Sequence, residues 1–421
     1  MGSSNLTALQ RKNLDDVVVT MAIRSPLCKA KKGGFKDMRR VFLFKISRLA
    51  VNVPHFCRSD ELLTEMFRQA INHCRIDPAI FDDICVGTVL AKGPTYEARA
   101  AALAAGIPES VPVQTLNRFC SSGLMSVTTI ANEIRAGQID VGLAVGVESM
   151  SWNPDVGPEG ASDEIKMCGP ASDALQPMGW TSENVAREFN ISREDMDDFA
   201  ARSFQRAEAA DRAGYFAKEI VPFTSYQKDA TTGVRKKVTI SKDDGIRYAT
   251  TKANLLKIKP AFPQWPPAQT TGGNASQITD GAAAVLLMNR RKAEELGLRI
   301  LGKYVNVAVT GLAPHIMGIG PTIAIPKVLE KVGLKKEEVD LFEINEAFAS
   351  MYVYCVRKLE LDQDKVNVNG GAIAFGHPLG ATGARQVVTG LSELERRGGK
   401  VLVTSMCVGT GMGAAAVFLR E

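Results

Sequence analysis

Residues 117–147 read NRFCSSGLMSVTTIANEIRAGQIDVGLAVGV and form the most informative unit of the chain. Cys120 stands among small residues, and the pattern after it predicts a helix over 121–136 that ends at Gly137. An apolar run then predicts a buried strand over 141–147. Alternating helices and strands of this kind are typical of a layered α/β fold.

The same order of features returns about 260 residues later. Gly380 begins a predicted helix over 380–397, Gly398 ends that helix, and a strand follows over 400–405. The predicted strand over 84–90 has a similar counterpart over 341–345. The order therefore predicts two similar halves, with residues from equivalent sheet ends converging between them.

Composition changes in the middle of the chain divide it into parts. Residues 151–277 are richer in proline, charge and irregular stretches, with helices predicted near 180–189 and 193–213, which indicates an inserted, surface-lying domain. The strand and helix alternation resumes from about 280. The expected parts are a disordered terminus at 1–14, an N-terminal half at 15–150 plus 278–299, a loop domain at 151–277 and a C-terminal half at 300–421.

The bulk composition is that of an ordinary globular protein. The 421 residues are 45% hydrophobic and 23% charged, and no run reaches the roughly 18 apolar residues that span a bilayer, so we expect a soluble chain. The net charge of +5 equals the charge of residues 38–58, which hold five basic residues and no acid. One short basic segment does not make the basic face that nucleic-acid binding needs.

The cysteine pattern argues against a metal centre or a disulfide framework. None of the eight cysteines is in CxxC spacing, and the four histidines form no cluster beside them. A reducing compartment fits this pattern best.

Three residues in glycine-rich surroundings predict acyl-transfer chemistry: Cys120, His377 and Cys407. A nucleophilic sulfur needs a base within reach, and we expect the helix start at Cys120 to lower the thiol pKa. The glycines around His377 are expected to let substrate approach closely. Asn345 stands between a predicted strand and helix, where it is either a helix cap or a site residue.

These residues lie in four ordered motifs that resemble the signatures of the thiolase family. The motifs are NRFCSSGL, NEAFAS, GGAIAFGHPLGATGAR and SMCVGTGMGAA, and the resemblance covers residues 15–37 and 59–421, closest to degradative 3-ketoacyl-CoA thiolases of the fungal peroxisomal type. It implies two βαβαβαββ halves in five αβαβα layers, with residues 151–277 holding CoA. It also implies a homodimer and a peroxisomal location, or otherwise the cytoplasm, because neither terminus shows a clear targeting signal.

The resemblance implies a role for each motif residue. Cys120 would be the nucleophile, His377 its base, and Cys407 the acid and base for the leaving enolate and the incoming CoA. Asn345 would hold a water that forms one oxyanion hole with His377, and the backbone N–H groups of Cys120 and Gly409 would form another. The residues implied at the CoA and acyl groups are Met178, Ser276 and Phe348. CoA would be a substrate, with no metal or redox cofactor.

The implied reaction is the cleavage of 3-ketoacyl-CoA by CoA in fatty-acid β-oxidation. A biosynthetic acetoacetyl-CoA thiolase is the alternative, but that branch usually has His-Met-Gly where this chain has Gln176-Pro177-Met178-Gly179. A decarboxylating ketoacyl synthase would need a second histidine in place of Asn345. A further alternative is an acyl-CoA-binding relative that the segment 38–58 inactivates.

The segment 38–58 interrupts the family pattern between Asp37 and Asp60. It is either an insertion or a translated intron, and its apolar residues at 41–44 are expected to be exposed and to favour aggregation. It contains Arg48-Leu49 and His55-Phe56 in the spacing of a peroxisomal signal, which we interpret as chance because the match is internal.

Overall fold

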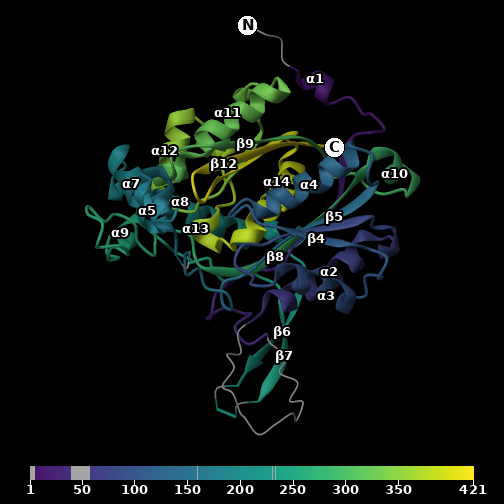
Figure 1. The fold of residues 1–421 in the computed structure, drawn as a ribbon, viewed down its shortest axis with the longest axis horizontal. Coiled ribbons are helices and arrows are strands. Elements are labelled where there is room, and N and C mark those ends of the chain that lie inside the picture. The colour runs from purple at the N-terminus through teal and green to yellow at the C-terminus, as the bar shows by residue number, and fades with distance from the viewer. Residues whose placement is uncertain (1–4, 39–56, 159, 230, 233) are drawn as a thin grey trace.

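The computed structural model describes residues 5–38, 57–158, 160–229, 231–232 and 234–421 (Figure 1). The expectations for residues 39–56, including exposure and aggregation, fall outside these ranges. Strands predicted from apolar runs and helices predicted from periodicity are present, with boundaries that differ by a few residues. No helix within the described ranges is long and apolar enough to cross a bilayer.

The first half of the chain builds a five-stranded arrangement in the order β4-β3-β5-β8-β1. Strands β4, β3 and β5 run parallel, whereas β8 is antiparallel to both β5 and β1. The strands are β1 (Val17–Arg24), β3 (Asp83–Gly87), β4 (Val113–Leu116), β5 (Val141–Ser149) and β8 (Thr279–Asn289). A short strand, β2 (Cys28–Lys29), also pairs with β8.

The second half repeats this order as β10-β11-β12-β9. Strands β10 and β11 are parallel, and β12 is antiparallel to both β11 and β9. The strands are β9 (Gly302–Gly311), β10 (Leu341–Ile344), β11 (Val401–Val408) and β12 (Met412–Arg420). A bridge between Phe342 and Val366 stands where β4 stands in the first half. The shared order confirms the predicted internal repeat.

Helices between and outside the sheets give five layers, α-β-α-β-α (Figure 1). Helices α4 (Ser122–Arg135) and α14 (Leu379–Arg397) lie between the sheets in one apolar core. A second core joins the first sheet to α2 (Ser59–Cys74) and α3 (Pro94–Ala105). A third core joins the second sheet to α11 (Pro321–Val332) and α12 (Ala349–Leu359).

The central helices touch each other through backbone at glycines. A Cβ on Gly123 would lie 2.6 Å from the Gly380 oxygen, and one on Gly383 would lie 2.3 Å from the Leu124 nitrogen. A Cβ on Gly146 of β5 would lie 2.5 Å from the Gly380 oxygen. The expectation that glycines near His377 open a path for substrate is therefore wrong for Gly380 and Gly383, which are needed because the layers pack so closely.

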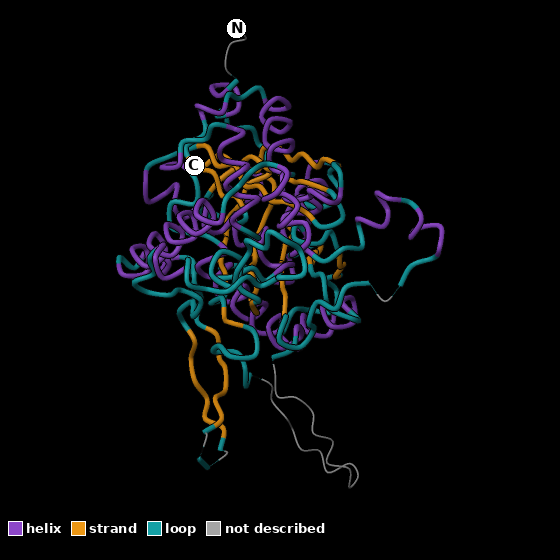
Figure 2. The backbone as a smooth tube through the Cα atoms, turned by 90° about the vertical axis from the view of Figure 1, so that its left-hand side faces the viewer, coloured by secondary structure: helices purple, strands orange, loops and turns teal. Residues whose placement is uncertain are grey.

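The segment from 151 to 277 carries helices and a hairpin along one side of the molecule. The hairpin, β6 (Phe223–Lys228) with β7 (Arg235–Ile240), projects from the body (Figure 2). Sequence reasoning missed it because its strands are rich in lysine and lack a clear apolar alternation. The helices are α5 (Asp163–Met167), α6 (Gly169–Asp173), α7 (Met178–Glu188), α8 (Arg193–Arg212) and α9 (Lys252–Leu255).

Residues 5–14 contact the second half, although they were expected to be disordered. Helix α1 (Leu6–Leu9) packs Leu6 and Leu9 against the core of the second half. The Asn5 backbone N–H donates to the Gly333 oxygen at 3.1 Å, and its side-chain amide donates to the Val332 oxygen at 3.0 Å. Two leucines and these bonds are enough to dock a short polar terminus.

The residues on either side of 39–56 lie in the core. Met38 and Cys57 are buried, with their sulfur atoms 3.4 Å apart. The Ser149 hydroxyl donates to the Cys57 carbonyl at 2.7 Å, and the Arg58 guanidinium lies 5.2 Å from the Trp152 ring centre. The described residues on the two sides of this gap therefore meet in the core.

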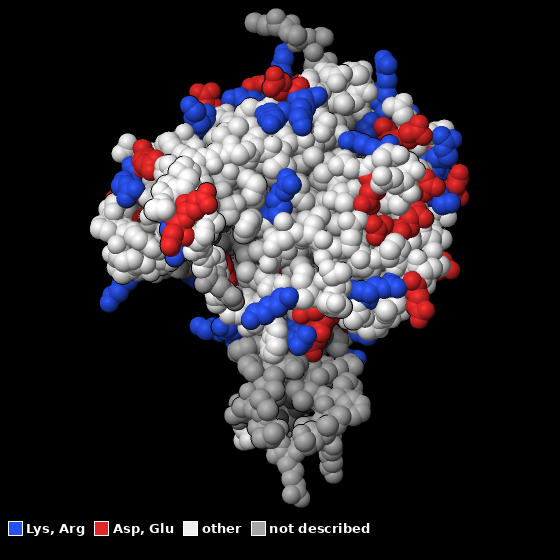
Figure 3. Space-filling view, in the orientation of Figure 1, with Lys and Arg blue, Asp and Glu red and all other residues white. Residues whose placement is uncertain are grey.

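Charge is distributed without a basic face on the side of the molecule in Figure 3. Lysine and arginine are interspersed there with aspartate and glutamate across a largely uncharged surface. No group of three potential metal-ligating side chains lies close enough to hold an ion within the described ranges.

Candidate active site

Cys120 lies in the turn that connects β4 to α4. Phe119 has a φ of +46°, and the Ser122 hydroxyl holds the turn by accepting from the Arg118 N–H at 2.9 Å and donating to the Phe119 oxygen at 2.7 Å. Cys120 is only 8% exposed. Burial raises the pKa of the Cys120 thiol to about 12, although the N–H groups of Gly409 and of Cys120 itself act in the opposite direction.

This pKa overturns the expectation that the helix start would lower it. Cys120 lies two residues before α4 begins, and the cost of placing a thiolate in a buried site exceeds the benefit of the nearby N–H groups. The thiol therefore rests protonated and needs a base.

His377 lies between α13 (Ala372–Phe375) and α14, and it is buried. Its Nδ1 is 2.5 Å from the Thr382 hydroxyl, and its Nε2 is 3.2 Å from the Asn345 side-chain nitrogen. Burial, followed by the nearby Arg385 cation, lowers the pKa of His377 to about 3. The ring is therefore neutral at rest, with one of its two nitrogens unprotonated.

Asn345 follows directly after β10 and brings an amide to His377. Its backbone N–H donates to the Ser405 oxygen at 2.9 Å, which continues the pairing of β10 with β11. The side-chain Oδ1 is buried without a hydrogen-bond partner among the described residues. A buried acceptor of this kind is a suitable place for an ordered water.

Cys407 lies on β11 opposite Gly413 and is buried. Burial raises the pKa of Cys407 well above its usual value, and negative charge on Cys120 would raise it further. Two residues later, the Gly409 N–H faces the Cys120 sulfur. The end of β11 and the start of α4 therefore meet at the two thiols.

The three remaining predicted residues come from separate segments around this point. Met178, the first residue of α7, and Phe348 pack against the apolar cluster that contains Cys407. The Ser276 N–H donates to the Ala347 oxygen at 3.0 Å, next to the bridge between Ala275 and Phe348. The structure thus places the segments of all three near the second thiol.

Several polar residues that sequence reasoning did not select support the site from behind. The backbone carbonyl of Gln277 accepts a hydrogen bond from the backbone N–H of His377 at 3.1 Å. The buried Glu148 carboxylate accepts from the N–H groups of Val89, Leu90 and Gly380 at 3.0–3.1 Å, and burial raises its pKa to about 7. Glu148 therefore ties the start of α14 to the first half.

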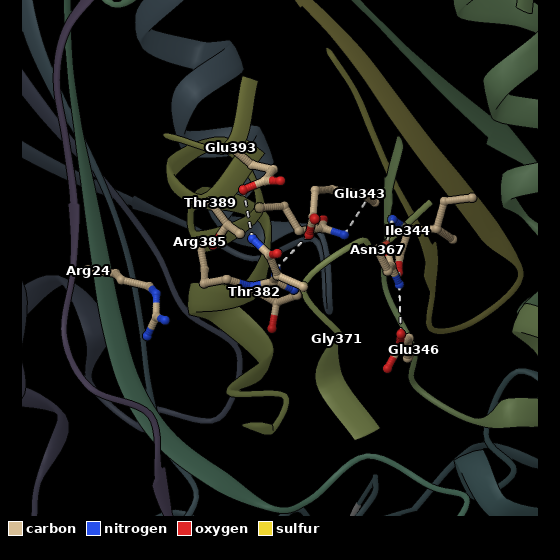
Figure 4. Close-up of polar contacts among 12 residues, drawn as sticks. Arg24, Glu343, Ile344, Glu346, Asn367, Gly371, Thr382, Arg385, Thr389 and Glu393 are labelled. Carbon is tan, nitrogen blue, oxygen red and sulfur yellow. Dashed lines mark hydrogen bonds and ion pairs between the residues drawn. The ribbon is translucent and has the colours of Figure 1, made fainter. Parts of the chain in front are cut away.

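A row of polar side chains also follows one side of α14 (Figure 4). Arg385 donates to the Glu343 carboxylate at 2.8 Å, and both side chains are buried. One turn later, Thr389 donates to Glu219 at 3.2 Å, and Glu393 accepts from Asn369 at 2.9 Å. The signal for these residues was polar positions at helical spacing along α14, at 382, 385, 389 and 393.

This arrangement is suited to acyl transfer between thiols. It offers two protonated sulfurs, a neutral imidazole, two N–H groups that face the first sulfur, and a buried amide oxygen that has no partner in the described part of the chain. A neutral imidazole can take a thiol proton, and N–H groups at the sulfur can stabilise an oxyanion formed on it.

Comparisons with known proteins cover nearly the whole chain. The family model "Thiolase, N-terminal domain" matches residues 54–291, and "Thiolase, C-terminal domain" matches 298–420. The peroxisomal 3-ketoacyl-CoA thiolase of Yarrowia lipolytica is 49% identical over an alignment of 423 positions that covers 100% of this chain and 96% of that protein. The human peroxisomal 3-ketoacyl-CoA thiolase is 49% identical over 98% of this chain and 93% of that protein.

Solved structures agree with these matches. The dimeric peroxisomal thiolase of Saccharomyces cerevisiae superposes with a TM-score of 0.87 at 45% identity, covering 99% of this chain and 100% of that chain. The human mitochondrial 3-ketoacyl-CoA thiolase in complex with CoA gives a TM-score of 0.81 at 34% identity, covering 97% of this chain and 98% of that chain.

Proposed function

This chain belongs to the thiolase family, and on that basis we propose that it cleaves 3-ketoacyl-CoA with CoA to acetyl-CoA and a shortened acyl-CoA. Relatives of nearly the same length are named peroxisomal 3-ketoacyl-CoA thiolases, which supports fatty-acid β-oxidation in the peroxisome. The observation that carries the proposal is the meeting of the Cys120 sulfur with the Gly409 N–H beside a second buried thiol.

In the first half-reaction, His377 Nε2 takes the Cys120 proton and the sulfur attacks the keto carbon. The bond between C2 and C3 then breaks, and its electron pair remains on C2 as the enolate of acetyl-CoA. Cys407 donates its proton to C2, which releases acetyl-CoA and leaves a Cys407 thiolate. The high pKa of Cys407 suits this step, because an enolate carbon needs a weak acid that stays protonated until then.

In the second half-reaction, the Cys407 thiolate removes the proton of the incoming CoA thiol. The CoA sulfur attacks the acyl thioester on Cys120, and the carbon–sulfur bond to Cys120 breaks. The proton held by His377 returns to the Cys120 sulfur, so that all three groups regain their resting state. These steps need no metal or redox cofactor, and CoA enters as a substrate.

Oxyanions form at two positions in this sequence, on the carbon that is bonded to Cys120 and on the thioester oxygen of the enolate, and two sets of donors are proposed for them. The backbone N–H groups of Cys120 and Gly409 form one oxyanion hole, supported by their orientation toward the sulfur. A water on Asn345 forms the other with His377, supported by the unpartnered Oδ1 of Asn345. One such donor is typically worth about 3 kcal/mol in the transition state.

The parts of the chain that bind CoA and the acyl group are proposed to be the loop domain 151–277, with Met178 and Ser276, together with Phe348. Support comes from the apolar cluster that Met178 and Phe348 share with Cys407. The chain lacks a histidine at Asn345, which disfavours a decarboxylating synthase. Comparing the rates of cleavage of acetoacetyl-CoA and of longer 3-ketoacyl-CoA substrates distinguishes the proposed degradative enzyme from a biosynthetic acetoacetyl-CoA thiolase.

We also propose a homodimer, as the solved yeast relative is described as dimeric. Strand β4 forms an edge of the sheet and has half-buried side chains. Tyr96 on α3 is 88% exposed, and Phe119 after β4 is 39% exposed. An edge strand beside exposed aromatic rings is suited to pairing with a second copy, and sedimentation should show two chains per particle.

The test of the reaction is to trap its covalent intermediate. Incubation with a 3-ketoacyl-CoA in the absence of free CoA should release one acetyl-CoA per chain and leave the shortened acyl group on Cys120, as located by peptide mass spectrometry. Adding CoA should then release the acyl-CoA. Cys28→Ala serves as the matched control, because it removes another buried cysteine. An acyl group on a different cysteine, or binding without cleavage, contradicts the proposal.

A further inference from the structure

The Thr382 hydroxyl contacts the catalytic histidine and no part of the substrate path assigned above. We infer that Thr382 is a positioning residue that fixes the His377 proton on Nδ1 and so leaves Nε2 unprotonated. The Asn345 amide, 3.2 Å away in the resting site, gives up its bond to Nε2 when that nitrogen receives the Cys120 proton. This inference rests on the proposed function, in which His377 is the base. It concerns which of two ring nitrogens holds one proton.

The hydrogen bonds of Thr382 give the direction of each contact. Its hydroxyl lies 3.0 Å from the Pro378 carbonyl oxygen, one turn earlier in the chain, and a carbonyl can only accept, so the hydroxyl proton points there. The same oxygen lies 2.5 Å from His377 Nδ1. With its own proton engaged, the Thr382 oxygen acts as the acceptor, and Nδ1 must carry the hydrogen.

Counting hydrogen bonds for the two neutral forms of the ring supports this assignment. With the proton on Nδ1, three bonds form: Nδ1–H to Thr382, Thr382 to Pro378, and the Asn345 amide to Nε2. With the proton on Nε2, the Asn345 amide must turn over to accept it and Thr382 must turn away from Pro378. Only two bonds then remain. The amide exchanges one unpartnered buried group, its oxygen, for another, its NH₂, so the lost bond between Thr382 and Pro378 decides the balance.

The surroundings of the ring keep it in a neutral form in which this choice exists. The side chains that act on it are the hydroxyl of Thr382, the amide of Asn345 and the cation of Arg385. Arg385 is itself paired with Glu343, so the Glu343 carboxylate is bound to the guanidinium and not to the His377 ring. In the resting site, burial and Arg385 disfavour a second proton on the ring, so the position of the single resting proton decides whether Nε2 is open to the Cys120 proton during the reaction.

The test compares three variants of α14. Thr382→Val removes the hydroxyl at nearly constant volume, and Thr382→Ser restores it. Thr389→Val is the matched control, because Thr389 is equally buried on the same helix and its hydroxyl bonds to Glu219 instead of the histidine. The chain has four histidines, so ¹⁵N-histidine labelling with His377→Asn as the assignment variant resolves the His377 ring signals.

The wild-type protein and Thr382→Ser should show Nδ1 protonated and Nε2 unprotonated by ¹⁵N chemical shift. Thr382→Val should move the proton toward Nε2 and slow acylation of Cys120 by about 10²-fold. Thr389→Val should lower the melting temperature by about as much as Thr382→Val does. It should leave both the His377 ring signals and the acylation rate unchanged.

Two results would overturn the inference. One is an unchanged His377 tautomer in Thr382→Val, and the other is an equal loss of acylation in Thr389→Val. Because the ring signals are measured without substrate, an inactive wild-type protein would instead contradict the proposed function and leave the tautomer result interpretable.

Discussion

Cys120, His377 and Cys407 all rest in their uncharged forms because each one is buried. The site therefore holds no standing thiolate and imidazolium pair, in contrast to sites where a nearby charge or an open helix end stabilises a thiolate. A proton leaves Cys120 only as the sulfur attacks, when the negative charge passes on to an oxygen that faces N–H donors. The unreacted sulfur is protected from oxidation by the same burial.

Replacing Cys407 with serine should separate the two half-reactions. Cys407→Ser retains a small polar group but lacks an acid of suitable strength, so acylation of Cys120 by a simple acyl-CoA should persist. Thiolysis should fall by at least about 10²-fold, the usual value of a general acid–base group. Exchange of the α-protons of acetyl-CoA with deuterated water, followed by NMR, should be lost with it.

Cys355→Ser is the matched control for this variant. Cys355 is also buried near Cys407, but it bonds to the Gly318 carbonyl and not to the reaction centre. Thiolysis that is unchanged in Cys407→Ser, or equally reduced in Cys355→Ser, would remove Cys407 from the mechanism.

Among the secondary-structure elements, those with one apolar face were predictable and those held by polar contacts were not. Helix α2 and strand β8 follow from apolar periodicity, because that periodicity is what buries them. The β6–β7 hairpin and α1 contact distant segments, as in the bonds from Ser225 to the Gly34 oxygen and from Asn5 to the Val332 oxygen. A local pattern carries no information about such partners.

Removing residues 39–56 should leave the fold intact, since Met38 and Cys57 already meet in the core. Joining them through a short Gly-Ser linker changes loop length, which costs only about 0.6 kcal/mol per doubling. The free energy of unfolding should stay within about 1 kcal/mol of the full chain, and the soluble yield should rise. Urea denaturation and the yield of purified protein measure both effects.

A longer deletion, 39–58, provides the comparison for this experiment. It also removes the Cys57 carbonyl that accepts from Ser149 and the Arg58 N–H that donates to Glu61 at 3.0 Å at the start of α2. It should lower stability by about 2 kcal/mol. If the shorter deletion unfolds the protein as well, residues 39–56 are a necessary part of the structure.

For the whole molecule, stability should depend on pH through the buried histidine. The pKa of His377 is about 3 in the folded chain and about 6.5 when unfolded, so the unfolded state binds more protons as pH falls below 6.5. Wild-type protein should therefore lose about 1.4 kcal/mol per pH unit between pH 6 and 4, relative to His377→Gln. Buried Glu148 and Glu343 are present in both proteins, so their opposite contributions cancel.

Urea titrations of the two proteins at several pH values measure this difference. His73→Gln, which removes an exposed histidine from α2, is the control. Its free energy of unfolding should change with pH as that of the wild type does. A constant difference between wild type and His377→Gln over this range would show that the ring is not held neutral by the fold.

At the scale of the molecule, the sequence predicted that the segments of Cys120 and Cys407 meet, but not what burial does to the two thiols. The repeat of strand order implied that Cys120, His377 and Cys407 lie at equivalent sheet ends, and their motifs named them. Their resting protonation depends on burial in the assembled layers, which no single segment determines. For the same reason Thr382 and Glu148 emerged only once α14 was seen against its neighbours.

The glycine contacts between α4, β5 and α14 have a consequence for recombination between homologous genes. At Gly123, Gly146, Gly380 and Gly383 the neighbours are mostly main-chain atoms, which every protein sequence has in common. A crossover that exchanges one half for that of another family member therefore keeps these contacts between the two halves, provided that the glycines remain. Hybrid enzymes can inherit Cys120 from one parent and His377 with Cys407 from the other, while the spacing of the shared reaction centre is preserved.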